Sequence, residues 1–299
     1  MCFTQNIMKV IDVINSENPT ISMEVFPPKQ KDKYESIEKA TEEIASYKPG
    51  FMSVTYGAGG GTSDFTVSIA SNLEKKYDIP VLAHLSCISS TKEGVKKQLQ
   101  LMKDQGITNV LALRGDIPED APQNAEWEYH YATELVREIK EFDEAMCIGG
   151  ACYPEVHPDS VNQIEDIKHL KEKVDAGCEF LTTQMFFDNS IFYNFLYKVR
   201  EAGIYVPIVP GIMPITNIKQ LQRTLKLSGT VLPQRFRFLL DKFGSDEKAM
   251  KQAGLIYASE QIIDLYANGI KNVHVYSMNK PEVAKTLMTN FSEIIKWQQ

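Results

Sequence analysis

Eight short apolar runs recur along this chain, and a longer helical pattern follows almost every one of them. Each run is nearly continuous in hydrophobicity and rich in β-branched or aromatic residues, which is typical of parallel strands covered on both faces. Most corresponding run ends are 27 to 39 residues apart, and one strand–helix–strand step needs about 30 residues. The candidate strands are Ile21–Phe26, Phe51–Tyr56, Val81–Cys87, Asn109–Arg114, Cys147–Tyr153, Glu179–Met185, Val206–Ile212 and Asn272–Tyr276.

Helical patterns fill the intervals between these runs, and an amphipathic segment precedes the first run. Only the last interval is long, and it contains two helical stretches, Ile218–Leu227 and Glu247–Ala267, around a connection with Pro233. Eight such units predict an α/β fold, a (β/α)8 TIM-type barrel with an N-terminal helix and a helical insert before the last strand. A doubly wound open sheet is the alternative, because strand order cannot be read from sequence. The other helices expected are Tyr34–Tyr47, Ser63–Tyr77, Lys92–Gln105, Tyr131–Phe142 and Ser160–Ala176.

Length and composition narrow the class of protein. A barrel of this type uses about 250 residues, so residues 1–299 are expected to form one domain. The formal net charge of −7 argues against a nucleic-acid partner. No apolar run approaches the roughly 18 residues of a membrane span, and the five cysteines form no CxxC pair. We therefore expect a cytoplasmic protein with reduced thiols and no membrane partner.

Polar residues recur where the predicted strands end. Active sites of barrels lie at the carboxyl ends of the strands, and a polar group inside an apolar strand is costly unless it is satisfied. The set therefore predicts a functional site, although each member alone could serve a strand-to-helix turn. The residues are Glu24, Thr55, His84, Arg114, Asp116, Tyr153, His157 and Gln184.

Glu24 is the most informative of these residues. Met23, Val25 and Phe26 surround it, and desolvation raises the pKa of a carboxyl group. A raised pKa suits Glu24 to act as a general acid near neutrality. The alternative is a structural ion pair with a cation such as Arg114.

Two further features indicate phosphate binding. The Gly57–Gly61 loop is rich in glycine but matches neither GxGxxG nor a Walker loop, so a turn that needs positive φ is an equal explanation. Asp166, His169 and Lys173 share one helix face, which points toward the strand ends. A phosphate group there could meet Lys173, although a lysine on a helix is more often solvated.

A zinc site is the main alternative interpretation of the polar residues at the strand ends. His84, Cys87, Cys152 and His157 could supply ligands. However, the chain contains neither HxH nor HExxH, and Cys152 should point away from the face of Tyr153. We therefore expect no metal site.

Ten sequence strings, in order over nearly the whole chain, resemble the methylenetetrahydrofolate reductase family. The resemblance implies a barrel that holds FAD non-covalently and reduces 5,10-methylenetetrahydrofolate to 5-methyltetrahydrofolate. NADH or NADPH would first reduce the flavin and leave, and folate would then bind at the same face, which predicts ping-pong kinetics. The strings are SMEVFPPK, FMSVTYGAGGGT, LAHLSC, ALRGDIP, YATELV, YPEVHPDS, LKEKVDAG, TTQMFFD, VPGIMPITNIKQ and VYSMNK.

The resemblance also implies roles for individual residues. Glu24 would protonate the bridging nitrogen as the imidazolidine ring opens, and Asp116 would stabilise the cationic iminium. Gln184, Gln220 and Lys280 would contact folate. Thr55 would lie by the nicotinamide, on the cofactor-binding side of the site. The implied FAD contacts are Tyr56, Ala58, His84, Arg114, Gly115, Asp116, Tyr131, Ala132, Tyr153, His157, Asp166, His169 and Lys173.

Three positions depart from the family pattern. Lys280 stands where an arginine is familiar, and a lysine loses the bidentate geometry toward a carboxylate. Thr224 replaces an aromatic residue of some relatives, and Glu172 replaces a basic residue beside Lys173. These changes bear on the folate contact, on ring stacking and on the pyrophosphate contact, respectively.

Other expectations concern regulation and partners. Longer relatives carry a regulatory domain after the barrel, for which this length leaves no room, so no S-adenosylmethionine switch is expected. Barrels of this kind commonly associate, so a homo-oligomer is expected. The alternatives to a nicotinamide-dependent reductase are a subunit that takes electrons from a partner protein and a zinc-dependent barrel methyltransferase or hydrolase.

Overall fold

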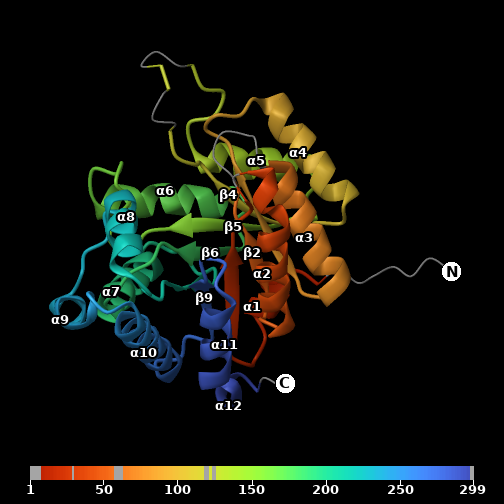
Figure 1. The fold of residues 1–299 in the computed structure, drawn as a ribbon. Coiled ribbons are helices and arrows are strands. Elements are labelled where there is room, and N and C mark those ends of the chain that lie inside the picture. Colours follow the sequence, from red (N-terminus) through yellow and green to blue (C-terminus); the bar gives the residue numbers. More distant parts are fainter. Residues whose placement is uncertain (1–7, 29, 57–62, 118–120, 123–125, 297–299) are drawn as a thin grey trace.

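A computed structural model describes residues 8–28, 30–56, 63–117, 121–122 and 126–296 of this chain. Its strands form one parallel sheet in the order β7-β6-β5-β4-β3-β2-β1-β9-β8, with helices around the outside (Figure 1). The strands are β1 (Thr20–Val25), β2 (Met52–Val54), β3 (Val81–Ser86), β4 (Asn109–Leu113), β5 (Cys147–Cys152), β6 (Phe180–Thr183), β7 (Ile208–Val209), β8 (Gly211–Ile212) and β9 (Asn272–Tyr276).

The seventh predicted strand, Val206–Ile212, is divided in two at Pro210. The first half, β7, pairs with β6, and the second half, β8, pairs with β9. Proline has no N–H group to donate to a ladder, although the Pro210 carbonyl still accepts from the His274 N–H at 2.9 Å. Because β7 and β8 are consecutive halves of one run, they close the sheet into a ring. The TIM-type barrel is therefore confirmed, and the open sheet is wrong.

The predicted helices are present, and Ser63–Tyr77 and Glu247–Ala267 match their predicted bounds. The connection at Pro233 differs from expectation, because a further helix, α9, begins directly after it. A proline suits this place, since the first N–H groups of a helix have no partner within the helix. The helices are α1 (Val10–Ile14), η1 (Lys31–Lys33), α2 (Tyr34–Ser46), α3 (Ser63–Tyr77), α4 (Lys92–Asp104), α5 (Ala132–Phe142), α6 (Gln163–Asp175), α7 (Asn189–Glu201), α8 (Ile218–Ser228), α9 (Gln234–Phe243), α10 (Glu247–Ala267), α11 (Pro281–Asn290) and α12 (Ser292–Ile295).

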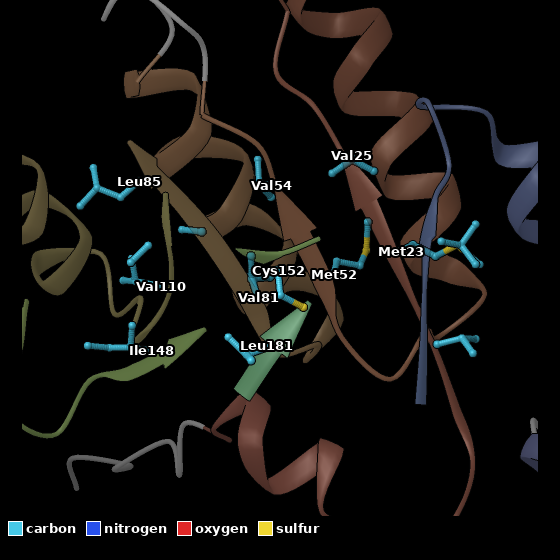
Figure 2. Close-up of a cluster of buried hydrophobic side chains, with 14 of the residues drawn as sticks. Met23, Val25, Met52, Val54, Val81, Leu85, Val110, Ile148, Cys152 and Leu181 are labelled. Carbon is cyan, nitrogen blue, oxygen red and sulfur yellow. The ribbon is translucent and has the colours of Figure 1, made fainter. Parts of the chain in front are cut away.

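The largest core lies between the sheet and the surrounding helices. Met23, Val25, Val54, Val81 and Leu181 belong to it (Figure 2). Because side chains alternate across a strand, the residues between them point the other way, into the barrel. In β1 these inward residues are Ser22 and Glu24.

The amino-terminal end of the barrel interior is filled by a second cluster, here named the apolar plug. Helix α1 closes this end, and the Val10 N–H donates to the buried Asn109 side chain at 2.8 Å. Its members are Val10, Val13, Ile14, Phe51, Leu82, Leu111, Cys147, Phe180 and Val209. Because the plug fills the amino-terminal end of the barrel, the space for a site lies at the carboxyl ends of the strands.

Two other expectations concern the membrane and the thiols. Within the described parts of the chain, no helix has both the length and the apolar character needed to cross a bilayer. Cys87, Cys147, Cys152 and Cys178 are free and buried. Burial raises the pKa of the Cys87 thiol to about 12, so this thiol is not activated as a nucleophile.

Candidate active site

A group of polar side chains, all of them buried except Glu24, lies in the barrel directly above the apolar plug. We name this group the polar layer, and its members come from four neighbouring strands, β1, β2, β3 and β9. The strand register brings them together, because Glu24 lies beside Ser53 on one side and beside Tyr276 on the other. The members are Ser22, Glu24, Ser53, His84 and His274.

Glu24 lies where the polar layer meets the open end of the barrel. Its side chain is 19% exposed, and its Oε2 atom lies 3.6 Å from His84 Nε2 and 4.0 Å from His274 Nε2. Both histidines are buried. The carboxyl group is therefore mostly desolvated, yet still reachable from the open end.

Burial determines the protonation state of these three groups. It raises the pKa of Glu24 to about 8, against a smaller opposite effect of a hydrogen bond from Ser53. Burial also lowers the pKa of His84 and of His274 to about 3. At neutral pH the histidines are thus uncharged and cannot form ion pairs with Glu24, which remains a protonated acid. The raised pKa predicted from the sequence is confirmed.

The alternative ion pair between Glu24 and Arg114 is wrong. Arg114 Nη2 instead lies 2.7 Å from Asp159 Oδ2 at the rim of the barrel. Gly115 follows with φ of +85°, and a Cβ there would lie 2.9 Å from Ser86 Cβ. Asp116 is exposed at the same rim.

His274 is a member of the site that the sequence analysis missed. Its Nδ1 lies 2.7 Å from Ser22 Oγ, and its Nε2 lies 3.0 Å from Ser53 Oγ. The imidazole ring stacks on Phe51, with centroids 5.5 Å apart. The available signal was a polar residue in the middle of an apolar run, as in NVHVY, rather than at its end.

A second cluster of predicted residues lies where β5 meets α6. The rings of Tyr153 and His157 pack edge to face, with centroids 4.5 Å apart. Asp166 accepts from the His157 N–H at 3.2 Å and from Ser160 Oγ at 3.0 Å. Lys173 Nζ donates to the Ala151 carbonyl at 2.7 Å. This face of α6 therefore does point toward the barrel at Asp166 and Lys173, as predicted.

The same side of the rim carries the start of α5. Tyr131 is 60% exposed, while Ala132 is buried at the first position of the helix. The Tyr131 and His169 rings lie 6.1 Å apart. An exposed aromatic ring beside an exposed imidazole offers a surface for a planar ligand.

The remaining predicted residues lie around the rest of the rim. Thr55 and Tyr56 are half-buried after β2. Gln184 is half-buried after β6, and its Oε1 accepts from the Met185 N–H at 3.0 Å. Lys280 Nζ donates to Thr216 Oγ1 at 2.5 Å, and burial lowers the pKa of this lysine.

Three predictions fall wholly or partly outside what the structure describes. Ala58 and the Gly57–Gly61 loop lie outside the described residues. Gln220 lies in α8, but its side chain is also outside the described set. Thr224 is half-buried in the same helix.

The zinc ligands proposed as a competitor are not assembled. Among the described residues, no three His, Cys, Asp or Glu side chains are grouped as a metal site. Cys152 lies in the outer core instead, and its Sγ lies 3.7 Å from the Thr182 carbonyl.

Comparison with protein families gives a match over nearly the whole chain. The family model for methylenetetrahydrofolate reductase matches residues 9–292. A methylenetetrahydrofolate reductase (NADH) 1 of Arabidopsis thaliana is 35% identical over 303 residues, which cover 96% of this chain and 51% of the plant protein. The chain thus spans about half the length of that relative.

Bacterial relatives are closer in length. A 5,10-methylenetetrahydrofolate reductase of Pectobacterium carotovorum is 34% identical, covering 88% of this chain and 87% of the relative. The corresponding Escherichia coli protein is 33% identical, with 88% of each chain covered.

A solved structure from Clostridium thermocellum has the same fold. It superposes with a TM-score of 0.68 at 17% identity, covering 95% of this chain and 98% of that one. That protein is described as binding two copies of 5-methyl-5,6,7,8-tetrahydrofolic acid.

Proposed function

The chain belongs to the methylenetetrahydrofolate reductase family, and from that premise we propose that it reduces 5,10-methylenetetrahydrofolate to 5-methyltetrahydrofolate. The electrons would come from NADH or NADPH. The observation that carries this proposal is Glu24, a mostly desolvated acid with its pKa raised to about 8 at the open end of the barrel. Reduction of this substrate needs such a proton donor, because the imidazolidine ring opens only when its bridging nitrogen is protonated.

Glu24 would supply that proton from a carboxyl group that is already neutral at physiological pH. General acids work best when their pKa lies near the working pH. After transfer, the carboxylate stays beside two uncharged histidines. Asp116 at the rim would place a negative charge near the iminium cation that ring opening creates.

Residues on the β4, β5 and α6 side of the rim fit FAD. The guanidinium of Arg114, the ammonium of Lys173 and the imidazole of His169 offer cations or donors suited to a pyrophosphate. The exposed ring of Tyr131 offers a flat apolar surface. Bound FAD would carry hydride from nicotinamide to folate. The full proposed set also includes Thr55, Tyr56, Ala58, His84, Gly115, Asp116, Ala132, Tyr153, His157 and Asp166.

The opposite side of the rim would hold folate. Gln184, Gln220 and Lys280 are the proposed contacts, with Lys280 facing a glutamyl carboxylate. A Clostridium thermocellum protein of the same fold is described as binding 5-methyl-5,6,7,8-tetrahydrofolic acid, which is compatible with folate at this face. We also propose that residues 1–299 act as one catalytic barrel in the cytoplasm, as a homo-oligomer.

Anaerobic half-reactions would test this function. Purified protein should take up FAD and turn yellow, and NADH or NADPH should bleach it. Added 5,10-methylenetetrahydrofolate should then restore the colour and yield 5-methyltetrahydrofolate. Alternating half-reactions of this kind produce ping-pong kinetics.

Other outcomes would overturn the proposal. A protein that takes up no FAD, or whose reduced flavin is not oxidised by the folate, would not be this reductase. Bleaching only with an added partner protein would indicate a subunit of a larger redox complex. Stoichiometric zinc in the purified protein would favour a barrel methyltransferase or hydrolase.

A further inference from the structure

Glu155 joins two parts of the rim that lie far apart in the sequence. It belongs to the turn after β5, and its Oε2 atom accepts a hydrogen bond from the Val231 N–H at 2.8 Å. Val231 belongs to residues 229–233, here named the α8–α9 connection. The turn lies on the side of the rim proposed for FAD, and α8 carries Gln220, a proposed folate contact. One hydrogen bond therefore links the two proposed ligand sides.

The turn that contains Glu155 is strained. The Val156 N–H donates to the Tyr153 carbonyl at 3.2 Å, which closes residues 153–156 into a turn. Val156 has a φ of +87°, a left-handed conformation that a β-branched side chain rarely adopts. Such strain persists only where the surrounding structure enforces it, and strained residues cluster at functional sites.

Hydrogen bonds hold this turn from two directions. On its far side, the His157 N–H donates to Asp166 Oδ2 at 3.2 Å. On its near side, the Glu155 carboxyl group accepts from the α8–α9 connection. The rings of Tyr153 and His157, which pack edge to face, are thereby fixed relative to each other. Without the Glu155 bond the turn loses one of these anchors, and Val156 is free to relax toward negative φ.

The α8–α9 connection has a second anchor directly beside the first. Thr230 is buried, and its Oγ1 donates to the Met185 carbonyl at 3.3 Å. The Met185 N–H in turn donates to Oε1 of Gln184, a proposed folate contact. The connection is therefore bonded to the loop after β5 and to the loop after β6 through neighbouring residues. These two bonds fix the end of α8 relative to both loops.

Stability of the fold does not explain a carboxyl group at this place. Glu155 is half-buried, and its Oε1 atom is buried without a hydrogen-bond partner among the described residues. A buried oxygen without a partner costs stability, and burial raises the pKa of this carboxyl group. Val231 is 58% exposed, so water could satisfy its N–H group if Glu155 were absent. We therefore attribute the bond to the placement of the two segments that it joins.

We propose that Glu155 is a positioning residue that ties the FAD side of the rim to the folate side. The proposal deepens the proposed function and rests on the binding of FAD and folate at these two sides. Glu155 acts through Tyr153 and His157 on one side and through the end of α8 on the other. Because each side holds the other in place, loss of this one bond should weaken the binding of both ligands.

Hydrogen exchange in the ligand-free, full-length protein tests the link directly. In Glu155→Ala the backbone amides of residues 153–160 and of residues 228–233 should both exchange faster than in the wild type, by roughly tenfold at Val231. Glu155→Gln keeps an acceptor oxygen for the Val231 N–H, so it should restore protection in both segments. Faster exchange in one segment alone, or in neither, would overturn the proposal.

A matched pair of variants at Val231 tests the same bond from the donor side. Val231→Pro removes the N–H group, whereas Val231→Ala keeps it and shortens an exposed side chain. Val231→Pro should reproduce the faster exchange of residues 153–160, and Val231→Ala should match the wild type. In the double variant, the effects of Glu155→Ala and Val231→Pro should not add, because both remove the same bond. Additive effects would contradict the link, and the pair keeps the test decisive if Glu155→Ala does not fold.

Binding measurements connect the link to the site. In Glu155→Ala, the affinities for FAD and for 5-methyltetrahydrofolate should each fall roughly three- to tenfold, and Glu155→Gln should recover most of both. Flavin reoxidation at saturating 5,10-methylenetetrahydrofolate should stay within about twofold of wild type, because Glu24 is unchanged. Weaker binding of one ligand alone would mean that Glu155 serves one side of the rim, and the link would be wrong.

The uptake of FAD separates this link from the proposed function. A wild-type protein that takes up no FAD would refute the proposed function, and hydrogen exchange would still decide whether Glu155 joins the two segments. A protein that takes up FAD and reduces the folate, but whose Glu155→Ala variant binds both ligands as the wild type does, would overturn the link alone.

Discussion

The two ends of the barrel interior are built from the same strands yet behave in opposite ways. On β3, Leu82 belongs to the apolar plug and His84, two residues later, belongs to the polar layer. The same change occurs at β2. Phe51, just before the strand, belongs to the apolar plug, and Ser53, within the strand, belongs to the polar layer. Residues two positions apart on a strand lie next to each other on the same face. The barrel interior therefore changes from apolar to polar between one layer of side chains and the next.

The difference shows how stability and chemistry are separated in one fold. The plug buries apolar side chains and the thiol of Cys147, and the burial of apolar area stabilises the barrel in proportion to the area removed from water. The polar layer buries three titratable groups whose pKa values are all displaced toward the neutral form, and such displacement costs stability. In barrels the carboxyl ends of the strands carry function and the opposite ends carry stability.

Glu24→Gln should have the largest effect on the rate of the reaction, and it should leave the packing of the apolar plug unchanged. The amide keeps the shape of the side chain but cannot donate an acidic proton. General acids contribute about 10²- to 10⁴-fold, so the folate half-reaction should slow by that factor. Stopped-flow measurement of flavin reoxidation by folate would record the change.

The reduction of bound flavin by nicotinamide is the internal control for this variant. That half-reaction should stay within about twofold of wild type, because it requires no proton from Glu24. Equal loss of both half-reactions would contradict the role given to Glu24.

Phe180→Ala should destabilise the apolar plug, the other end of the barrel interior. Phe180 is fully buried in the plug, against Gly149 of the neighbouring strand. Loss of a buried phenylalanine ring costs about 3–5 kcal/mol, including the cavity that it leaves. Urea denaturation should show this decrease, while the pH dependence of the folate half-reaction should be unchanged. A shifted pH profile in this variant would mean that the two layers are not independent.

The sequence predicted the barrel and its rim because both depend on regular patterns. Period and spacing locate strands such as Asn272–Tyr276, and strand ends locate Glu24 and Arg114. The pairing of Arg114 with Asp159 could not be predicted, since it depends on how the loops after β4 and β5 meet in space. His274 was missed for the same reason, because its partners Ser22 and Ser53 lie more than 200 residues away in sequence.

The polar layer should also contribute to the pH dependence of stability between a pH of about 3 and a pH of about 8, a range in which the plug has no group that titrates. Glu24 has a pKa of about 8 in the folded protein against an ordinary value of 4.5. Between these values the folded state binds more protons, so Glu24 makes stability fall as pH rises. His84 and His274 have pKa values of about 3 against 6.5, so they make stability fall as pH decreases through that window.

Comparing wild type with Glu24→Gln isolates the first of these contributions. The free energy of unfolding of the variant, relative to wild type, should rise by on the order of 4 kcal/mol between a pH of about 5 and a pH of about 9. Urea denaturation across this range measures it, with Phe180→Ala as a variant whose difference from wild type should not depend on pH. A constant difference for Glu24→Gln would mean that its folded pKa is not raised.

Lys280→Ala should give the smallest effect, since Lys280 lies at the rim, outside the polar layer. Its half-buried ammonium group donates to Thr216, and it would neutralise a carboxylate of bound folate. Loss of one charged hydrogen bond costs about 1.5 kcal/mol or more, so KM for folate should rise roughly tenfold while kcat changes little. Lys280→Arg should retain or improve KM, because a guanidinium can bind a carboxylate through two donors. If Lys280→Ala instead lowered kcat and left KM unchanged, the polar layer would extend to the rim, and the separation between binding and proton donation would be wrong.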